Sequence, residues 1–472
     1  MPEQRRSSAH RARPHDNRRP ARQAKRRMPG DAVRRAAYDV LRAVDTRDAY
    51  ANLLLPRVLR EKELSGRDAA LATELTYGTL RGRGTYDAIL DLCSDRPVAK
   101  IDPPLRDLLR LGVHQLLRTR IPAHAAVSTT VDLVRSVAGP GQAKFANAVL
   151  RRVTSRDLPG WLVVIAPDDE LGRLSVVHSH PRWMVSALRD AVGPAEIEDL
   201  LAADNERPGV TLVARPGRIP VEELYGLGAG PAAYSPYAAY LAEGDPGELA
   251  PVRDGRAGVQ DEGSQLVALA LAAAPLDGPD ASWLDVCAGP GGKAALLSAV
   301  GAERGAHLLA CDVQPHRADL ITRVVGANTT VLVADGTEPA WTPGSFDRVL
   351  VDVPCSGLGA LRRRPEARWR RTPQTVAELG PLQRALLSSA LDAARPGGVV
   401  AYVTCSPHLA ETRVVVDDVL RGRTDAVRLD AVDVLSGVAP GLSGLGTGPY
   451  AQFWPHRHGT DAMFLALLRR TA

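Results

Sequence analysis

The spacing of hydrophobic residues changes along the chain, and the first change separates a helical part from the rest. Between residues 31 and 153, apolar positions recur at i, i+3 and i+4, the period of an amphipathic helix. One such run is Val33, Ala36, Ala37, Val40, Leu41 and Val44, and another is Leu105, Leu108, Leu109, Val113 and Leu116. The pattern predicts an all-α domain of about five to seven helices over residues 29–156.

Beyond residue 260, short apolar runs alternate with helical ones. The runs read WLDVCAG, HLLACDV, TTVLVADG, FDRVLVDVP, GGVVAYVTC and MFLALLRR. Near-continuous apolar strands separated by helices predict a parallel sheet that is covered on both faces. We therefore expect an α/β, Rossmann-like domain over residues 259–472, with its ligand site beyond the carboxyl ends of the strands.

The segment between these two parts has a mixed pattern. Residues 157–169 carry Pro and Asp and indicate a linker. Residues 170–258 combine one helical stretch, RWMVSALRDAV, with short extended pieces such as GVTLVARP, and they predict a small α+β region. The chain is therefore expected to be multidomain.

Charge is concentrated at the N-terminus. The chain has 472 residues and a net charge of +5; its first 27 residues hold ten Lys or Arg against two acidic residues, so they carry +8 and the remainder carries −3. Such a segment cannot bury enough apolar surface to fold, and we predict a disordered tail over residues 1–28. It is either a solubilising extension or an arm attracted to nucleic-acid phosphates.

Cysteine usage and the lack of long apolar runs limit the class of protein. The five cysteines are Cys93, Cys287, Cys311, Cys355 and Cys405. Their odd number and the lack of a CxxC pair argue against a disulfide framework or a zinc module, and favour a reducing cytoplasm and no bound metal. No apolar run approaches the ~20 residues of a membrane span, and the basic N-terminus lacks the apolar core of a secretory signal.

A glycine-rich turn follows the first predicted strand of the α/β domain, in LDVCAGPGGK (284–293). Its glycines let the backbone approach a ligand closely, and the helix N-terminus after it favours negative charge. The predicted cofactor-binding residues here are Cys287, Ala288, Gly289, Pro290, Gly291, Gly292 and Lys293. The spacing of a P-loop is missing, and a plain strand-to-helix turn would also fit this motif by itself.

Two acidic residues at the next two strand ends extend this pattern. Asp312 can accept both hydroxyls of a ribose, and Asp335 can accept a hydrogen bond from an adenine amino group. Together with the turn, they outline an adenosine ligand. A dinucleotide site shares the turn and the first acid, but the GxGxxG motif is absent, so methyl transfer is preferred over hydride transfer.

Two cysteines stand at the ends of two further strands, in VDVPCSG (351–357) and YVTCSPH (402–408). A lone buried cysteine is usually a small hydrophobe, but two thiols at neighbouring strand ends beside a predicted cofactor suggest covalent catalysis. Asp352 precedes Cys355 by three residues, and Pro354 holds the turn so that both can face the pocket. The placement leaves open whether Cys355 or Cys405 is the nucleophile.

These motifs carry a family resemblance. QDEGSQ, LDVCAGPGGK, DVPCSGLGALRRRPEARWRR and YVTCSP are similar, in order, to the motifs of the S-adenosylmethionine-dependent RNA 5-methylcytosine methyltransferases. The helical part resembles the NusB-like RNA-binding domain. The resemblance covers about residues 31–470. It implies a class I methyltransferase fold, S-adenosylmethionine as cofactor, and RNA, in particular small-subunit ribosomal RNA, as partner.

The resemblance also implies roles for the site residues. RNA enzymes of this family use the Thr-Cys cysteine, which implies that Cys405 attacks C6 of cytosine and that Cys355 assists release. Asp352 would bind near the methyl donor and the base edge. DNA 5-methylcytosine enzymes use the Pro-Cys cysteine, which would reverse the two roles. Gly289 stands where this family usually has alanine, a small change that we expect to keep the backbone path.

The stretch LRRRPEARWRR (361–371) holds six arginines around Trp369. A charge run is usually a solvated face, but this one follows the Pro-Cys motif, so we also predict phosphate contact and base stacking here. The target base must leave its stack to reach a thiol, which suits an RNA loop or an unstacked segment.

Two other functions remain as alternatives. The helical domain alone would suit a non-catalytic NusB-like RNA-binding or antitermination factor, but such a module needs no paired thiols. An amino methyltransferase typically carries an Asn/Asp-Pro-Pro-aromatic motif after its fourth strand, where this chain reads DVPCSG. We expect a monomeric, cytoplasmic RNA cytosine-C5 methyltransferase.

Overall fold

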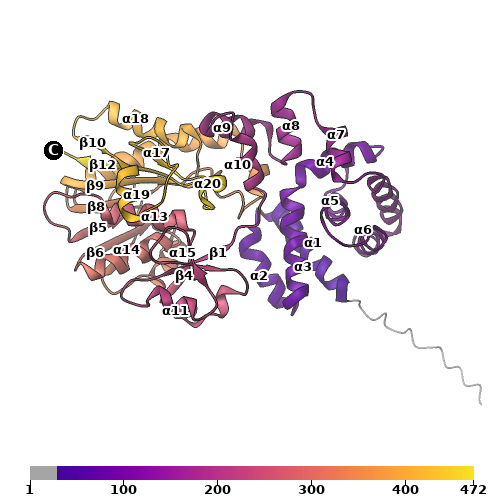
Figure 1. The fold of residues 1–472 in the computed structure, drawn as a ribbon, viewed down its shortest axis with the longest axis horizontal. Helices are drawn as coiled ribbons and strands as arrows, with labels where there is room; N and C mark the ends of the chain where they lie inside the picture. Colours follow the sequence, from indigo (N-terminus) through magenta and orange to yellow (C-terminus); the bar gives the residue numbers. More distant parts are fainter. Residues whose placement is uncertain (1–28) are drawn as a thin grey trace, which may run out of the picture.

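The computed structural model describes residues 29–472, with a helical part at one side and a sheet domain at the other (Figure 1). In Figure 1 the N-terminal helices, in indigo and purple, lie to the right, and the strands of the sheet, in orange and yellow, lie to the left. The predicted basic tail, residues 1–28, lies outside the described residues. Between residues 29 and 472, no helix is long and apolar enough to cross a membrane.

Within the described chain, the N-terminal part consists of six α-helices around one apolar core. They are α1 Pro29–Arg47, α2 Ala51–Glu61, α3 Gly66–Arg81, α4 Arg83–Cys93, α5 Pro103–Arg118 and α6 Ala123–Val153, with a 3₁₀ turn η1 at Val98–Lys100. The apolar positions predicted to share helix faces are buried, for example Val33, Val40 and Leu108. Helix α6 bends at Gly139, where a φ of 89° interrupts the helix before Pro140. The all-α prediction for this part is confirmed.

The middle region adds four helices and then a small antiparallel sheet. The helices are α7 Leu158–Ile165, α8 Glu170–Val177, α9 Arg182–Val192 and α10 Ile197–Ala203. The sheet has the order β2-β3-β1-β4, with β1 Val210–Ala214, β2 Gly230–Pro231, β3 Ala238–Leu241 and β4 Ala257–Val259; α11 Val221–Tyr225, η2 Pro246–Glu248 and α12 Ala250–Arg253 lie between its strands. The segment predicted to be a linker contains α7 instead, because Asp157 caps this helix and Trp161 packs into the helical core.

The C-terminal domain is built on a twisted sheet in the order β10-β12-β9-β8-β5-β6-β7. Its strands are β5 Ser282–Asp285, β6 His307–Asp312, β7 Thr329–Val333, β8 Phe346–Asp352, β9 Ala394–Thr404, β10 Ala426–Leu429 and β12 Phe464–Arg470, with β11 Ala451–Gln452 paired to β12. Its helices are α13 Glu262–Ala273, α14 Gly292–Glu303, α15 Pro315–Thr322, α16 Ala367–Arg370, α17 Pro373–Ala393, α18 Arg413–Arg421, α19 Ala431–Val438 and α20 Pro455–His458, with η3 at Leu409–Glu411.

Alternate residues of the central strands face two different helical layers. In β8, Leu350 packs on the side of α13, α14 and α19, whereas Val349 and Val351 pack on the side of α17 and α18. In β9, Val403 and Tyr402 divide in the same way. Because both faces of each strand are covered, the strands read as near-continuous apolar runs.

The sheet is mixed rather than wholly parallel. The pairs among β5, β6, β7, β8 and β9 are parallel, as the sequence predicts, but β12 runs antiparallel to β9, and β10 antiparallel to β12. The chain order reverses between β5 and β8, because β6 and β7 extend the sheet to one side and β8 and β9 to the other. This is the switch point at which doubly wound sheets bind their ligands.

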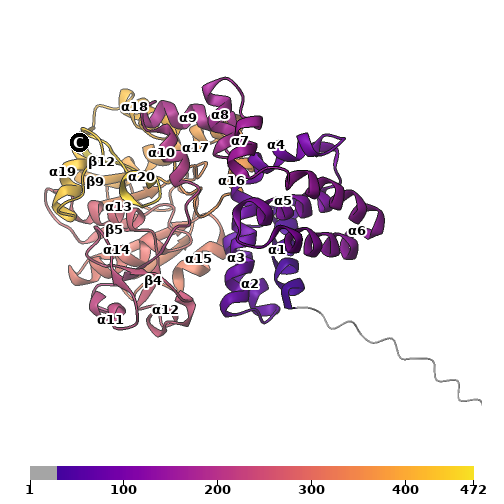
Figure 2. The ribbon, with the colours of Figure 1, turned by 45° about the vertical axis from the view of Figure 1, so that its right-hand side comes forward.

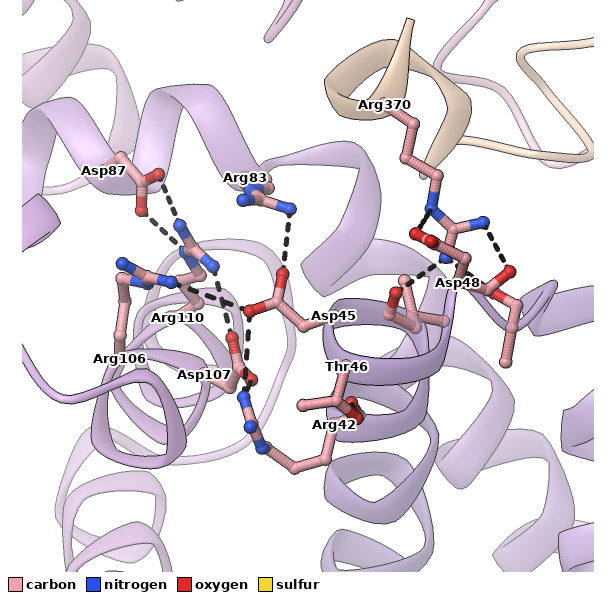
Figure 3. A network of polar contacts seen from close by, with 12 residues as sticks. Arg42, Asp45, Thr46, Asp48, Arg83, Asp87, Arg106, Asp107, Arg110 and Arg370 are labelled. Atoms are coloured by element: carbon pink, nitrogen blue, oxygen red, sulfur yellow. Dashed lines mark hydrogen bonds and ion pairs between the residues drawn. The ribbon is translucent and has the colours of Figure 1, made fainter.

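Helix α16 lies where the helical part meets the sheet domain (Figure 2). Arg370 of this helix donates to the carbonyl oxygens of Val44 and Ala49, both at 2.7 Å, at the end of α1 (Figure 3). The carboxylate of Glu366 accepts the backbone N–H of Ala51, at the start of α2, at 3.1 Å. The segment thus satisfies polar groups that two helix ends leave without intrahelical partners, with a cation at the C-terminus and an anion at the N-terminus.

A cluster of charged side chains inside the helical part adjoins the same boundary (Figure 3). Asp45 of α1 lies within ion-pair distance of three guanidinium groups, at 3.4 Å from Arg83, 3.6 Å from Arg106 and 3.7 Å from Arg42. The Arg83 guanidinium also lies over the Trp369 ring, 5.7 Å from its centroid. The cluster therefore joins α1, α4 and α5 to the segment that carries Trp369.

Arg368 is fully buried where three parts of the chain meet. It donates to the carbonyl oxygen of Asp204 at 2.8 Å and to the side-chain oxygen of Asn205 at 2.7 Å, both at the end of α10. It also donates to the carbonyl oxygens of Arg81 and Ser179 at 3.3 and 3.4 Å. Burying a guanidinium is costly unless its N–H groups find acceptors; here Nη1 and Nη2 find four, and only Nε has none within the described chain.

The arginine segment is therefore mainly an internal clamp, which corrects the prediction that it forms an RNA-contacting face. Of its six arginines only Arg364 is exposed. The others bind protein groups: Arg362 and Arg363 bind Asp461, Arg371 binds the Ser356 carbonyl, and Arg368 and Arg370 bind as described above.

Replacing Arg368 with Met should lower the free energy of unfolding by about 3 to 5 kcal/mol, because four acceptors and the buried Asp204 carboxylate would lose their cation. Urea denaturation measures the change. The control is Arg364→Met in the same segment, which removes an exposed cation lying over the Tyr50 ring and should cost about 1 kcal/mol or less. Equal losses in the two variants would contradict the clamp.

Candidate active site

The predicted site residues gather at one edge of the sheet. Asp285, Asp312 and Asp352 are the last residues of β5, β6 and β8, and Cys405 directly follows β9. Because these strands are parallel, their carboxyl ends lie side by side. Among residues 29–472, no group of three or more His, Cys, Asp or Glu side chains could hold a metal ion.

The glycine-rich turn between β5 and α14 packs directly against the end of β6. The Ala288 N–H donates to the Cys311 carbonyl at 2.7 Å. Gly291 precedes α14 with a φ of 111°, and a Cβ there would lie 2.6 Å from Val324 Cγ2 and 3.1 Å from the Ile321 Cα. Glycine is thus required at this position by both the backbone angle and the space.

Asp312 fixes this turn through its carboxylate. It accepts the backbone N–H groups of Gly289 at 3.1 Å and Gln314 at 2.9 Å, and Arg317 Nη1 lies 3.2 Å from its Oδ2. A Cβ on Gly289 would lie 2.3 Å from this oxygen. An alanine at position 289 would therefore require the Asp312 side chain to move in this arrangement. The expectation that glycine keeps the backbone path of the family's alanine stays a prediction.

Asp335 lies in the loop after β7 and is exposed. Its Oδ1 accepts the backbone N–H of Thr337 at 2.8 Å and the Thr337 hydroxyl at 2.7 Å, and these bonds lower the pKa of the carboxyl. The side chain is held in place locally. Its predicted contact with an adenine amino group stays a prediction.

Asp285 is a buried carboxylate whose two oxygens accept no hydrogen bond from the residues that the structure describes. Burial, and then the negative charge of Asp352, raises the pKa of its carboxyl to about 8. An unpartnered buried carboxylate at the end of the first strand can receive a cationic ligand group. This carboxyl group makes the edge suitable for a ligand that carries a positive charge.

Lys293 and Asp352 form an ion pair across the site. Lys293 Nζ lies 2.7 Å from Asp352 Oδ2, and the two side chains are 13% and 28% exposed. Burial opposes the charged form of the lysine, but the Asp352 carboxylate outweighs it and raises the pKa of Lys293. The lysine therefore stays a cation beside the thiols at neutral pH.

The two cysteine side chains meet at the ends of β8 and β9. The Cys355 and Cys405 sulfur atoms are 3.4 Å apart, and both residues are half-buried. A hydrogen bond from Cys355 lowers the pKa of Cys405 against the effect of burial, with help from the charges of Lys293 and Arg364. The same hydrogen bond, burial and nearby negative charge raise the pKa of Cys355 well above its ordinary value. The opposite directions favour Cys355 as the donor and Cys405 as the acceptor of this contact, whose geometry alone fits a hydrogen bond in either direction.

The loop after Cys355 crosses close to the backbone of Cys405. The Gly359 N–H donates to the Cys405 carbonyl at 2.9 Å, and the Ala462 N–H donates to the Gly359 carbonyl at 2.8 Å. A Cβ on Gly359 would lie 2.2 Å from the Ala462 carbonyl oxygen. Only glycine allows the loop after Cys355 to pass between β9 and the segment before β12.

Four further residues hold the two cysteine loops, and reasoning from the sequence missed them. They are Ser356, Gln383, Ser406 and Glu411. Glu411 is fully buried and accepts hydrogen bonds from the other three. The available signal was that each cysteine is followed by serine, in PCSG and TCSP. The glutamate itself has no such signal.

Comparisons with known proteins agree with this arrangement of domains. The family model described as "16S rRNA methyltransferase RsmB/F" matches residues 270–469, and the model of the NusB family matches residues 31–155. A Mycobacterium tuberculosis (strain H37Rv) protein named as a methyltransferase, Rv1407, is 55% identical over 94% of this chain and 98% of its own length. A Synechocystis protein named "Probable ribosomal RNA small subunit methyltransferase B" is 32% identical over 93% of this chain and 99% of its own length. A solved structure, "Crystal Structure of PH0851", has a TM-score of 0.77 at 21% identity, covers 94% of this chain and 99% of the other, and shares the fold.

Cys405 should be the first of the five cysteines to react with iodoacetamide at pH 7 to 8. Its pKa is lowered, whereas burial raises the pKa of Cys93 to about 11 and of Cys311 to about 12, and the pKa values of Cys287 and Cys355 are raised well above 9. We expect Cys405 to be alkylated at least about tenfold faster than Cys355, as peptide mass spectrometry would measure. Preferential labelling of Cys355 would reverse the proton assignment.

Proposed function

The chain belongs to the RsmB/F family of RNA methyltransferases, and from this premise we propose that it methylates carbon 5 of a cytosine in small-subunit ribosomal RNA, with S-adenosylmethionine as methyl donor. The observation that carries the proposal is the pair of thiols, 3.4 Å apart with opposite pKa shifts, beside Asp352 and Lys293. A binding protein has no use for two thiols paired in this way at the ends of neighbouring strands.

Cys405 acts as the nucleophile in this proposal. Carbon 5 of cytosine is too weak a nucleophile to take a methyl group unaided. Addition of the Cys405 thiolate forms a bond from sulfur to C6 and moves ring electrons towards C5, which can then accept the methyl group. The lowered pKa of Cys405 supports this role, because the thiolate is the attacking species.

Cys355 assists the release of the product. After methylation, a solvent water molecule takes the proton from C5, the electron pair of the C5–H bond re-forms the C5–C6 double bond, and the bond between C6 and the Cys405 sulfur breaks with its electron pair remaining on sulfur. A thiol held 3.4 Å away can donate a hydrogen bond to the departing thiolate and so favour its departure. The raised pKa of Cys355 supports this role, because it keeps the proton available.

Asp352 and Lys293 would face the edge of the target base. The Asp352 carboxylate can accept a hydrogen bond from the exocyclic amino group, and the Lys293 cation can offset the negative charge that enters the ring on thiolate addition. Their side chains form a 2.7 Å ion pair at the carboxyl end of β8.

S-adenosylmethionine fits the groups at the ends of β5, β6 and β7. Its positively charged ammonium group would complement the unpartnered Asp285 carboxylate, and its ribose hydroxyls would bind Asp312. Asp335 would accept the adenine amino group, and the turn from Cys287 to Lys293 would surround the ligand. When bound, the molecule supplies a methyl group activated by its sulfonium centre.

The NusB-like helical part would position the RNA. It is fixed to the sheet domain through Arg368 and Arg370, so RNA bound on its surface would stand at a set distance from the two thiols. The target cytosine must be turned out of its stack to reach them, and single-stranded segments allow this at lower cost.

Incubating the Cys355→Ala variant with S-adenosylmethionine and small-subunit ribosomal RNA should accumulate a protein–RNA adduct that survives denaturation, because release is impaired. The Cys405→Ala variant should give no adduct and should lose activity by about 10³-fold or more. Denaturing gel electrophoresis detects the adduct, and Cys93→Ala, outside the site, serves as control. An adduct with Cys405→Ala and none with Cys355→Ala would exchange the two roles, and RNA without 5-methylcytosine after wild-type treatment would contradict the reaction.

Asp312→Ala should weaken S-adenosylmethionine binding by about 10- to 100-fold, because hydrogen bonds from the ribose to a charged acceptor would be lost. Isothermal titration calorimetry measures the affinity directly and needs no RNA. The matched control is Asp319→Ala, an exposed carboxylate on α15 that follows the same strand. Similar affinities in the two variants would remove Asp312 from the cofactor site.

A further inference from the structure

Glu411 is a buried carboxylate without a cationic partner. Its side chain is fully buried in the turn η3 that follows β9, and no Lys or Arg of the described chain forms a hydrogen bond or ion pair with it. Four neutral donors satisfy it instead: Oε1 accepts the Ser356 N–H at 2.7 Å and the Gln383 amide at 3.2 Å, while Oε2 accepts the hydroxyls of Ser356 at 2.5 Å and Ser406 at 2.7 Å. A buried anion bound only by neutral donors is costly to maintain, so its retention calls for a physical reason.

The donors come from both loops that carry thiols. Ser356 directly follows Cys355, and Ser406 directly follows Cys405, so one carboxylate holds the residue next to each sulfur. Gln383 of α17 also donates to the carbonyl of Pro354, the residue before Cys355, at 2.9 Å. The carboxylate therefore joins the two loops, in addition to the backbone bond from Gly359 to Cys405 at 2.9 Å and the contact between the Ser356 and Ser406 hydroxyls at 3.1 Å.

No sheet ladder performs this task for the Cys355 loop. Residues 353–357 are irregular, and the last β8–β9 pair is Asp352 with Val403. The bridge through Glu411 replaces the missing ladder, and the Tyr402 hydroxyl ties η3 back to β9 by donating to the Glu411 carbonyl at 2.7 Å. The bonds from Ser356, Gln383 and Ser406 all end on the Glu411 carboxylate. Hydrogen bonds to a carboxylate fix the geometry of the loops more strongly than bonds between two neutral groups would.

The charge of Glu411 acts unequally on the two thiols. Together with Asp352 at the end of β8, it disfavours a thiolate at Cys355, in addition to the larger effects of the hydrogen bond to Cys405 and burial, and so raises the pKa of Cys355. The largest effects on Cys405 come from the hydrogen bond with Cys355, from burial, and from the charges of Asp352, Lys293 of α14 and Arg364. A negative charge on the Cys355 side favours the arrangement in which Cys355 donates and Cys405 accepts.

We propose that Glu411 is a positioning residue that sets both the spacing of the two thiols and the direction of the hydrogen bond between them. It does so through Ser356 and Ser406, without contact to RNA or cofactor. The inference rests on the proposed function for its consequence in catalysis, but the state of the thiols can be measured without either substrate.

Three variants separate geometry from charge. Glu411→Ala removes the acceptor for both loops. Glu411→Gln retains an oxygen for the Ser356 N–H and can donate to the serine hydroxyls, which rotate to accept, so it keeps the bridge and removes the charge. Ser406→Ala removes the bond to the Cys405 loop alone. The control is Glu378→Ala, an exposed carboxylate on α17, the helix that carries Gln383.

The first readout is the ratio of Cys405 to Cys355 alkylation at pH 8, in protein without RNA or cofactor. We expect Glu411→Ala and Ser406→Ala to lower this ratio by about tenfold, the effect of one pKa unit. Glu411→Gln should lower the alkylation ratio less, and the control should leave it unchanged.

The second readout is steady-state kinetics. In Glu411→Ala the kcat should fall by about 10- to 100-fold, as for a small misplacement of reacting groups, while the KM for RNA should stay within about twofold. Glu411→Gln should restore most of the lost kcat.

An unchanged ratio and kcat in a folded Glu411→Ala variant would overturn the proposal, as would a raised KM for RNA at normal kcat, which would assign Glu411 to RNA binding. If Glu411→Ala does not fold, as thermal unfolding would reveal, Ser406→Ala decides the question by the same two readouts. A wild type that labels selectively at Cys405 but forms no 5-methylcytosine would contradict the proposed function and leave the thiol arrangement standing.

Discussion

The parallel pairing of β8 with β9 is the constraint on which the site depends. The register pairs Asp352 with Val403, so the chain leaves both strands at the same level of the sheet. Cys355 and Cys405 follow within three residues of these positions, and their sulfur atoms meet at 3.4 Å. A slip of one residue in this register would turn every side chain of one strand to the other helical layer. Because both faces of β8 and β9 are apolar, the close packing of the buried side chains against each layer opposes such a slip. The positions of the two sulfur atoms thus depend on how the side chains of β8 and β9 pack inside the domain, away from the thiols themselves.

What could be predicted from the sequence was local or periodic. The helix period of the N-terminal part, the apolar strands and the glycine turn before α14 each involve residues close in sequence, and each was predicted correctly in kind. The direction of β12 was not predicted correctly, because an apolar run does not indicate whether the strand lies parallel or antiparallel to its neighbour. Glu411 was missed because the groups that it binds on the Cys355 loop are 55 residues away in the chain.

The arginine segment illustrates a different limit. Its composition is that of a nucleic-acid contact, yet Arg370 binds carbonyl groups more than 300 residues earlier, and Arg368 binds the end of α10, 164 residues earlier. A guanidinium has the same donors for a phosphate as for the end of a helix. Only burial separates the two uses, and burial depends on the packing of distant parts.

The contacts of α16 also bear on how this protein can be inherited and rearranged. The helical part is continuous in sequence, but the groups that complete the ends of α1 and α2 come from Arg370 and Glu366, more than 300 residues later in the chain. A helical domain exchanged with another protein would arrive with two open helix ends unless residues 362–371 came with it. The unit that must evolve together is therefore discontinuous: one segment of the catalytic domain belongs, in physical terms, to the helical one.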